Sequence, residues 1–179
     1  MSQDMVKIFG WDAVTLFYGT GNIVTAAADD SIAKTAIGTN SPAGTRLVCS
    51  SSEDAANDGT HVVASVSTAD KILTNSALTG NLDDDSMVIY GETPDIFYRV
   101  NFYNIITGII SSDQDVDVTF TWASAPVGGV EVDVTVSVTG GTPEPVYEYV
   151  YAPYLRVRIK NNDTAVATVS GILYSNSFV

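Results

Sequence analysis

Residues 130–138 read Val-Glu-Val-Asp-Val-Thr-Val-Ser-Val, with a valine at every second position. Alternation of this kind is typical of a β-strand that buries one face. A matching run lies upstream, where residues 115–122 read Asp-Val-Asp-Val-Thr-Phe-Thr-Trp. The segment between the two runs contains a proline and two glycines, which favour a turn. The sequence therefore predicts an antiparallel hairpin in which Trp122 pairs with Val130 and the apolar side chains share one face.

A second alternating run lies near the end of the chain. Residues 155–160 read Leu-Arg-Val-Arg-Ile-Lys, and Asn161-Asn162-Asp163 follows as a turn sequence. Pairing Lys160 with Thr164 places the apolar residues of this run opposite those of 165–169. We therefore predict a second hairpin, with its basic side chains on the outer face.

Shorter runs rich in Val, Ile, Thr, Tyr and Phe also indicate strands, and no long helical periodicity is present. Short strands separated by turn clusters predict an all-β protein, a single antiparallel β-sandwich of the jelly-roll type. We expect residues 1–44 to form an irregular N-terminal arm with the first strands. Residues 45–179 are expected to form the sandwich, with one domain overall.

The composition excludes several classes of protein. The chain has 179 residues, with 8 basic against 21 acidic side chains, which gives a net charge of −13. So few cations argue against binding to nucleic acid and to an anionic membrane surface. With 16% charged residues and a mean hydropathy of +0.16, a largely disordered chain is not expected. The first nine residues do not resemble a secretion signal, so we expect synthesis in a cytosol.

The sequence predicts no enzyme, no cofactor and no metal site. His61 and Cys49 are the sole residues of their types, and no serine lies in a nucleophile-elbow motif. The acidic run Asp83-Asp84-Asp85, or Asp54 with the nearby Asn57-Asp58, could attract a cation. Such runs are more typical of solvated loops, so we expect no catalytic, cofactor-binding or metal-binding residues.

Two sets of side chains are candidates for an interface. Tyrosine offers a large apolar area with a polar tip, which favours a subunit interface or core packing over a ligand platform. The first set is Tyr147, Tyr149, Tyr151 and Tyr154. We expect the first three of these to share one strand face.

The second set is a basic strip formed by Arg156, Arg158 and Lys160, which hold three of the eight cations. Like charges two residues apart repel, so the strip favours an acidic surface opposite. That surface is either in the same chain, on a second subunit or on another acidic partner; a solvated edge strand is the alternative. The acidic candidates within the chain are Asp115, Asp117, Glu131 and Asp133.

Two stretches resemble structural proteins of tailed bacteriophages. Residues 50–60, a Ser/Ala/Asp segment ending in Gly-Thr, are similar to segments of β-rich virion proteins. Residues 154–162, followed by 164–173, resemble the terminal hairpin of phage head, tail and fibre β-domains. The resemblance implies a non-enzymatic virion component, made in the host cytoplasm, that is often oligomeric, with a trimer favoured.

Among virion components, we expect a head decoration or minor capsid protein. Such a protein binds and stabilises the phage shell, so its partners would be the major capsid protein or other virion proteins. Neither nucleic acid nor a membrane is expected as a partner. A neck, tail or fibre module is the first alternative, and a carbohydrate-binding β-sandwich domain is the second.

Overall fold

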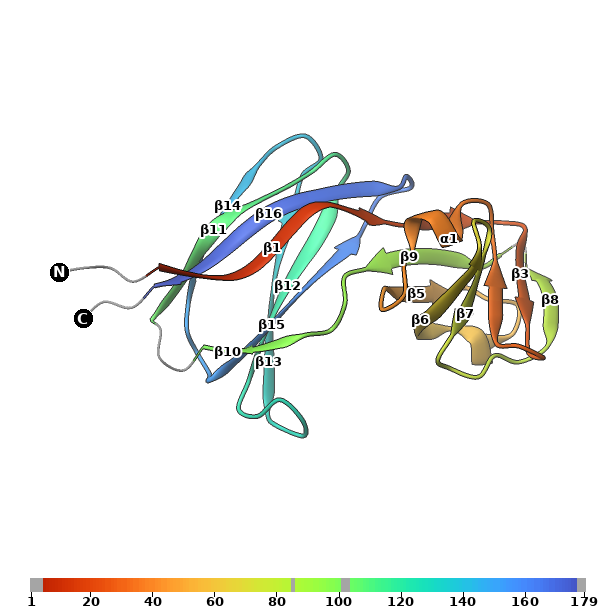
Figure 1. Cartoon of the computed structure of the whole chain (residues 1–179), viewed down its shortest axis with the longest axis horizontal. Helices are drawn as coiled ribbons and strands as arrows, with labels where there is room; N and C mark the ends of the chain where they lie inside the picture. Colours follow the sequence, from red (N-terminus) through yellow and green to blue (C-terminus); the bar gives the residue numbers. More distant parts are fainter. Residues whose placement is uncertain (1–4, 85, 101–103, 177–179) are drawn as a thin grey trace. The chain divides into compact units, whose positions relative to one another are not determined.

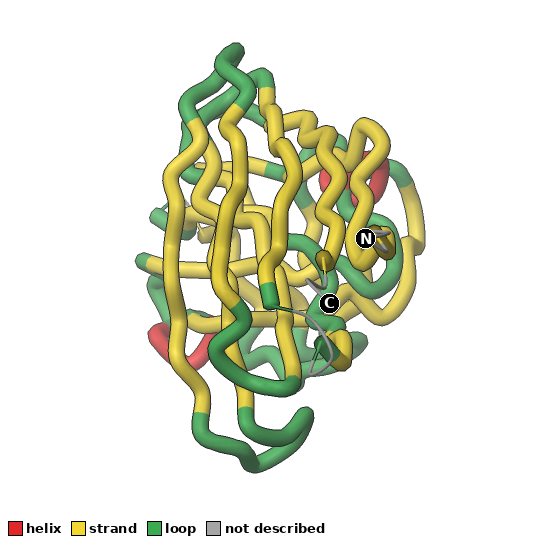
Figure 2. The backbone as a smooth tube through the Cα atoms, turned by 90° about the vertical axis from the view of Figure 1, so that its left-hand side faces the viewer, coloured by secondary structure: helices red, strands yellow, loops and turns green. Residues whose placement is uncertain are grey.

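The computed structural model describes residues 5–84, 86–100 and 104–176. Its regular structure is almost entirely β-strand, as Figure 2 shows. Within the described residues the helical elements are the four-residue α1 (Ile37–Asn40) and the 3-10 turn η1 (Ala55–Asn57). The predicted all-β class with packed antiparallel sheets is confirmed.

The chain divides into two compact units, each described separately below. One comprises Met1–Val14, Asp95–Ile159 and Thr168–Val179, and we call it the sandwich unit. The other comprises Thr15–Pro94 and Lys160–Ala167, and we call it the inserted unit because most of it lies in the chain between two sandwich strands. No Pro- or Gly-rich linker marks these crossings, which fall partly within strands.

The strands of the sandwich unit form two sheets (Figure 1). One has the order β1-β16-β11-β14 and the other the order β13-β12-β15-β10. The last residues of β1 and β15 and the first of β16 belong to the inserted unit. The strand bounds are β1 (Met5–Leu16), β10 (Phe97–Arg99), β11 (Ile105–Ser112), β12 (Val116–Ala123), β13 (Glu131–Val138), β14 (Glu144–Tyr149), β15 (Tyr154–Asn161) and β16 (Ala167–Asn176).

Alternating side chains fill the space between the two sheets. Every second residue of β12, from Val116 to Trp122, is buried, because this face of the strand points at the opposite sheet. Burying one large apolar side chain contributes roughly 1.5–3 kcal/mol, so these rows hold the unit together. Fully buried members of the other strands are Ile106, Ile110, Leu155, Ile159, Val169 and Leu173.

The first predicted hairpin exists, but its register differs from the prediction by two residues. Trp122 lies opposite Val132 rather than Val130, because Ser124 continues the ladder. The Ser124 amide donates to the Val130 carbonyl at 3.0 Å, and the Val130 amide donates to Ser124 Oγ at 2.9 Å. Gly128, at φ +68°, lies in the shorter loop that results. A shift of two keeps every side chain on its face, so the apolar face was predicted correctly.

The second predicted hairpin is wrong. β15 and β16 belong to different sheets: β15 pairs with β10, whereas β16 pairs with β11. The turn after Asn161 is real, since Asn161 Nδ2 donates to the Ala165 carbonyl at 2.7 Å. Both strands bury alternate residues against the same core, so their alternation fits two facing sheets as well as it fits one hairpin.

The inserted unit is a single antiparallel sheet with the order β2-β9-β5-β6-β7-β4-β3-β8. Strand β6 changes partner along its length, from β5 to β7, with register shifts in the second half. Its buried core includes Ile23, Ile32, Leu47, Ile72 and Ile89. The bounds are β2 (Tyr18–Thr20), β3 (Ile23–Ala26), β4 (Ser31–Ala33), β5 (Arg46–Ser50), β6 (Gly59–Thr68), β7 (Lys71–Thr74), β8 (Asn81–Asp84) and β9 (Val88–Glu92).

Residues 1–44 were expected to form an irregular arm together with the first strands. The described part of this segment contains β1, β2, β3, β4 and α1. Both compact units also draw residues from either side of residue 45. Residues 1–4 of this segment lie outside the described residues.

Candidate interaction surface

Apolar and aromatic side chains of β16, β11 and β14 gather on the outer face of the β1-β16-β11-β14 sheet, beside the hydroxyls of Thr107, Ser111 and Ser170. The register places Ile109 of β11 between Pro145 of β14 and Ile172 of β16, and it places Thr107 between Tyr147 and Tyr174. Side chains directly opposite each other in an antiparallel ladder point to the same side of the sheet. We call this surface the aromatic face, and its members are Pro145, Tyr147, Tyr149, Ile109, Ile172 and Tyr174.

Two tyrosines of β14 dominate the aromatic face. Period two sends Val146 into the core and leaves Tyr147 and Tyr149 outside, each 57% exposed. Their rings are 5.7 Å apart with planes at 89°. A hydrogen bond with Tyr149 raises the pKa of the Tyr147 hydroxyl. On the neighbouring strand, Ile109 is 47% exposed, so aliphatic and aromatic surface is available to a partner.

The other two tyrosines of the predicted set lie elsewhere. β14 ends at Tyr149, so Tyr151 does not share its strand face as we expected. The Tyr151 ring instead packs edge-on against the buried Trp122, with centroids 5.5 Å apart. Tyr154 is half-buried at the start of β15, opposite Arg99 of β10. The four tyrosines therefore do not form a single cluster.

The basic strip is paired with acids of its own unit. Arg156 is 9% exposed; its Nη1 lies 3.0 Å from an Asp95 oxygen and its Nη2 lies 3.0 Å from Glu131 Oε2. The guanidinium also lies over the Phe97 ring, 4.6 Å from its centroid. Arg158 Nη2 is 3.8 Å from an Asp133 oxygen. Two of the four acids proposed as partners within the chain thus face the strip.

The remaining members of these sets have other contacts. Lys160 belongs to the inserted unit, where its Nζ lies over the Tyr90 ring at 5.1 Å from the centroid. Asp117 accepts from Ser137 Oγ at 2.7 Å, and Asp115 accepts from the Gly140 amide at 2.8 Å. The strip is therefore not one row of three free cations, and its docking on a partner stays a prediction.

His61 and Cys49 have structural surroundings in the inserted unit. His61 is buried, and its Nε2 lies 2.9 Å from the Asn57 carbonyl. Cys49 is also buried, and burial together with the nearby Asp58 raises the pKa of its thiol to about 12. A thiol with that pKa carries little thiolate at neutral pH.

The acidic run on β8 serves as a hydrogen-bond acceptor for the surrounding loops. Burial raises the pKa of Asp84, but hydrogen bonds from Ser52, Glu53 and Met87 outweigh it and lower the pKa. Its oxygens accept from Ser52 Oγ at 2.6 Å and from the Glu53 and Met87 amides at 2.8 and 2.9 Å. Asp85 lies outside the described residues. Among those described, no group of three or more metal-binding side chains occurs.

Sequence reasoning identified two of the six members of the aromatic face, Tyr147 and Tyr149. Ile109, Ile172 and Tyr174 received no role, although a signal was present in Ile109-Ile110, a doublet that places apolar side chains on both faces of one strand. An apolar doublet of this kind is expected in a strand whose solvent-facing side is covered by a partner as well as its core-facing side by the core.

Comparisons with known proteins give no assignment. A scan against protein-family models and a search of the curated proteins both find no match for this chain. Within the described residues, no helix has the length and apolar character needed to cross a membrane.

Proposed function

We propose that this chain is a non-enzymatic structural protein of a tailed-phage particle whose sandwich unit docks on a partner through the aromatic face. The observation that carries the docking is the apolar outer surface of the β1-β16-β11-β14 sheet. An outer sheet face in contact with water is normally polar, and a contiguous apolar patch marks an interaction site. Tyrosine is also enriched in interfaces.

The connectivity of the sandwich unit supports a virion role. Numbered along the chain from β1 to β16, its eight described strands give sheet orders 1-8-3-6 and 5-4-7-2. We infer from this wrapped order that the unit is a jelly roll, an architecture common in viral capsid and lectin domains. Because fold alone does not fix function, the phage assignment rests on the sequence resemblance of residues 50–60 and 154–173. The second of these stretches keeps its sequence resemblance but not the hairpin that it implies, since β15 and β16 lie in different sheets.

Among virion roles, a decoration or minor capsid protein that stabilises the shell is the form we propose. The partner would then be the major capsid protein, and a stable contact would bury on the order of 1,000 Å² or more in total. A neck, tail or fibre module would use the same surface against a different virion protein. Homo-oligomers, including the trimer implied by the resemblance, are compatible with either role.

A carbohydrate-binding domain is the second candidate, and the ring geometry disfavours it. A sugar ring stacks flat on an aromatic face, so two tyrosines that share one platform need nearly parallel rings. The planes of Tyr147 and Tyr149 meet at 89°. The pair therefore presents one face and one edge, which suits irregular protein surface better than a flat sugar.

Co-sedimentation with purified phage heads tests the proposal. The full chain should pellet with the heads, and the double variant Tyr147→Ser with Tyr149→Ser should stay in the supernatant. The matched variant Tyr147→Phe with Tyr149→Phe keeps the apolar area and should pellet. Binding by the serine variant equal to that of the parent chain would reject docking through this face, and selective binding on a glycan array would favour the carbohydrate alternative.

A further inference from the structure

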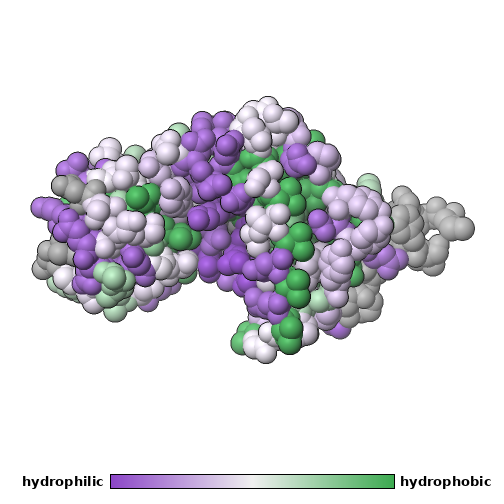
Figure 3. Space-filling model, turned by 180° about the vertical axis from the view of Figure 1, so that it is seen from behind, coloured by the Kyte–Doolittle hydropathy of each residue, from purple (hydrophilic) through white to green (hydrophobic). Residues whose placement is uncertain are grey.

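The strand β13 combines an open edge with exposed valines. It ends the order β13-β12-β15-β10, so within the described strands its pairing partner is β12 alone. Val132 is 59% exposed although it lies opposite Trp122, on the face that points inward on β12. Val130, directly before the strand, is 77% exposed. Figure 3 shows hydrophobic side chains in a band along this edge, down to the loop before β13. Long apolar edges of this kind pair readily with another strand.

Burial of the valines changes steadily along the strand. Val138 is buried, Val136 and Val134 are half-buried, and Val132 and Val130 are exposed. An antiparallel partner with the same sequence would place its covered end beside the exposed end of this strand. Each exposed valine would then gain an apolar neighbour.

The sequence of this edge is self-complementary in one antiparallel register. When two copies are centred on Val134, the alignment matches all five valines of 130–138 with valines. On the other face, Glu131 lies opposite Ser137 of the second copy and Asp133 lies opposite Thr135. A slip of two residues in one direction brings Asp133 opposite itself, and a slip in the other direction leaves Val130 without a valine.

The chain already uses these acid–hydroxyl pairs between β12 and β13. Thr121 Oγ1 donates to Asp133 at 2.6 Å, and Ser137 Oγ donates to Asp117 at 2.7 Å. Between them, the hydroxyls of Thr119 and Thr135 are 3.1 Å apart. These hydroxyls are satisfied within the chain, so in a β13 pair they would place an uncharged side chain opposite each acid.

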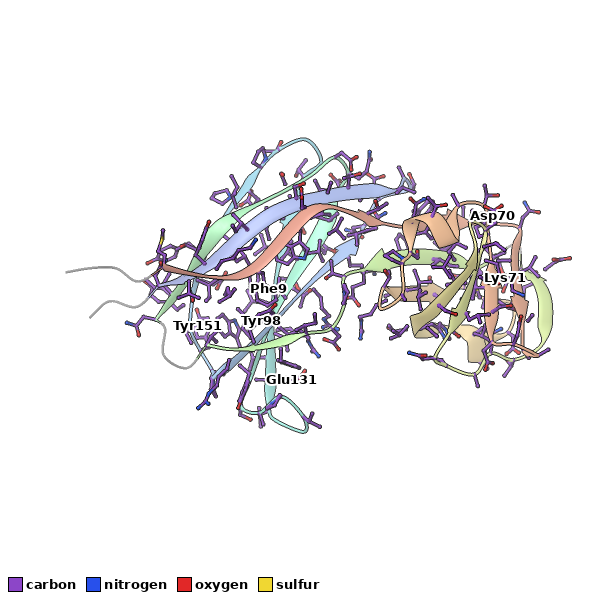
Figure 4. All side chains as sticks on the ribbon, in the orientation of Figure 1. Phe9, Asp70, Lys71, Tyr98, Glu131 and Tyr151 are labelled. Carbon is purple, nitrogen blue, oxygen red and sulfur yellow. The ribbon has the colours of Figure 1, made fainter. Side chains whose placement is uncertain are left out.

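Charge does not oppose this arrangement at close range. Glu131, labelled on the ribbon in Figure 4, is paired with Arg156, and Asp133 is close to Arg158. The opposing residues of the second copy are hydroxyls. Repulsion between two chains of net charge −13 remains at long range, and salt screens it.

We propose that β13 pairs antiparallel with β13 of a second copy of this chain, centred on Val134, and joins two sheets into one. The partner is a second copy because the register that buries the valines also places each acid opposite a hydroxyl. The contact has two-fold symmetry and predicts a dimer rather than the trimer that the phage resemblance implies. It does not depend on the proposed function.

Sedimentation of the full chain over a range of concentrations tests the pairing. We expect a monomer–dimer equilibrium that shifts toward dimer as salt rises. Val132→Lys places a charge on the exposed part of the edge and should abolish the dimer. Val66→Lys, at an exposed position of β6 in the inserted unit, is the matched control and should leave the dimer intact. A monomer at all concentrations, a trimer, or a dimer that survives Val132→Lys would overturn the proposal.

A cysteine at the centre of the proposed register gives a second, independent test. Val134 faces its own copy, so Val134→Cys should form an intermolecular disulfide under mild oxidation, whereas Val66→Cys should not. The native Cys49 is buried and gives little background. A Val134→Cys chain that is folded by circular dichroism and dimeric but does not cross-link would reject this register.

Discussion

The two sheets of the sandwich unit differ in the chemistry of their outer faces. The β13-β12-β15-β10 sheet carries charges that are paired within the unit, with Arg156 held between Asp95 and Glu131. The β1-β16-β11-β14 sheet carries the exposed side chains of Ile109, Tyr147 and Tyr149, which no described strand of its unit covers. The comparison teaches that a conspicuous row of charge need not be a docking site, because the fold can satisfy it internally. The outer face that lacks such internal pairing is the one that carries the aromatic face.

Removing the buried arginine of the charged face should give the largest loss of stability among these variants. Arg156→Met leaves Asp95 and Glu131 without their cation, and we expect a loss of about 2–3 kcal/mol in the free energy of unfolding. Urea denaturation measures this loss. Arg156→Met combined with Glu131→Gln removes one stranded charge and should recover part of it. An unchanged midpoint in the single variant would mean that the charged face is not internally stabilised.

The neighbouring arginine should matter less. Arg158 Nη2 lies 3.8 Å from Asp133, whose side chain is half exposed. A solvated ion pair of this kind contributes at most about 1 kcal/mol, so Arg158→Met should shift the urea midpoint less than Arg156→Met does. A larger midpoint shift for Arg158→Met than for Arg156→Met would show that burial of the side chain does not determine how much each arginine stabilises the fold.

A carboxyl group of β14 should show a weak pH dependence. Burial raises the pKa of Glu148 above its ordinary value of 4.5. A raised pKa in the folded state favours folding below the unfolded value, and this contribution is lost as pH rises through the folded pKa. Glu148→Gln should therefore raise the melting temperature slightly at neutral pH and not below pH 4.5. A larger rise in melting temperature below pH 4.5 than at neutral pH would contradict the predicted direction of the pKa shift.

The aromatic face should contribute least to stability. Tyr147→Ser with Tyr149→Ser changes two exposed side chains, so we expect a change within about 1 kcal/mol in the free energy of unfolding. Thermal melts of the parent and the variant measure it. A large loss would mean that these tyrosines are structural rather than available to a partner, and the contrast between the two outer faces would disappear.

Period-two patterns identified faces correctly and pairing partners poorly. The valines of 130–138 lie on the predicted face, but the Ser124 ladder shifts the register by two. Leu155 and Val169 are both buried as expected, yet they belong to opposite sheets. Alternation reports which side of a strand is covered, and it carries no information about which strand covers it.

The candidate surface was predictable in part for a similar reason. Tyr147 and Tyr149 were identified because tyrosines two residues apart share a face. Ile109 and Tyr174 join them only through pairing between distant segments, which a single sequence does not reveal. Arg156 was recognised as a strip residue, but its burial depends on Asp95, sixty-one positions earlier in the chain.

The adjacency of β1 and β16 bears on how the protein emerges from a ribosome. The first strand of the sandwich unit neighbours the last, with nearly the whole chain between them. The inserted unit is mostly contiguous, from Thr15 to Pro94, and can start to fold while synthesis continues. The sandwich unit cannot complete its β1-β16-β11-β14 sheet until β16 has been synthesised. During that interval the apolar face of β12 lacks the complete sheet that covers it, so slower translation of β16 would prolong the period in which nascent chains can aggregate.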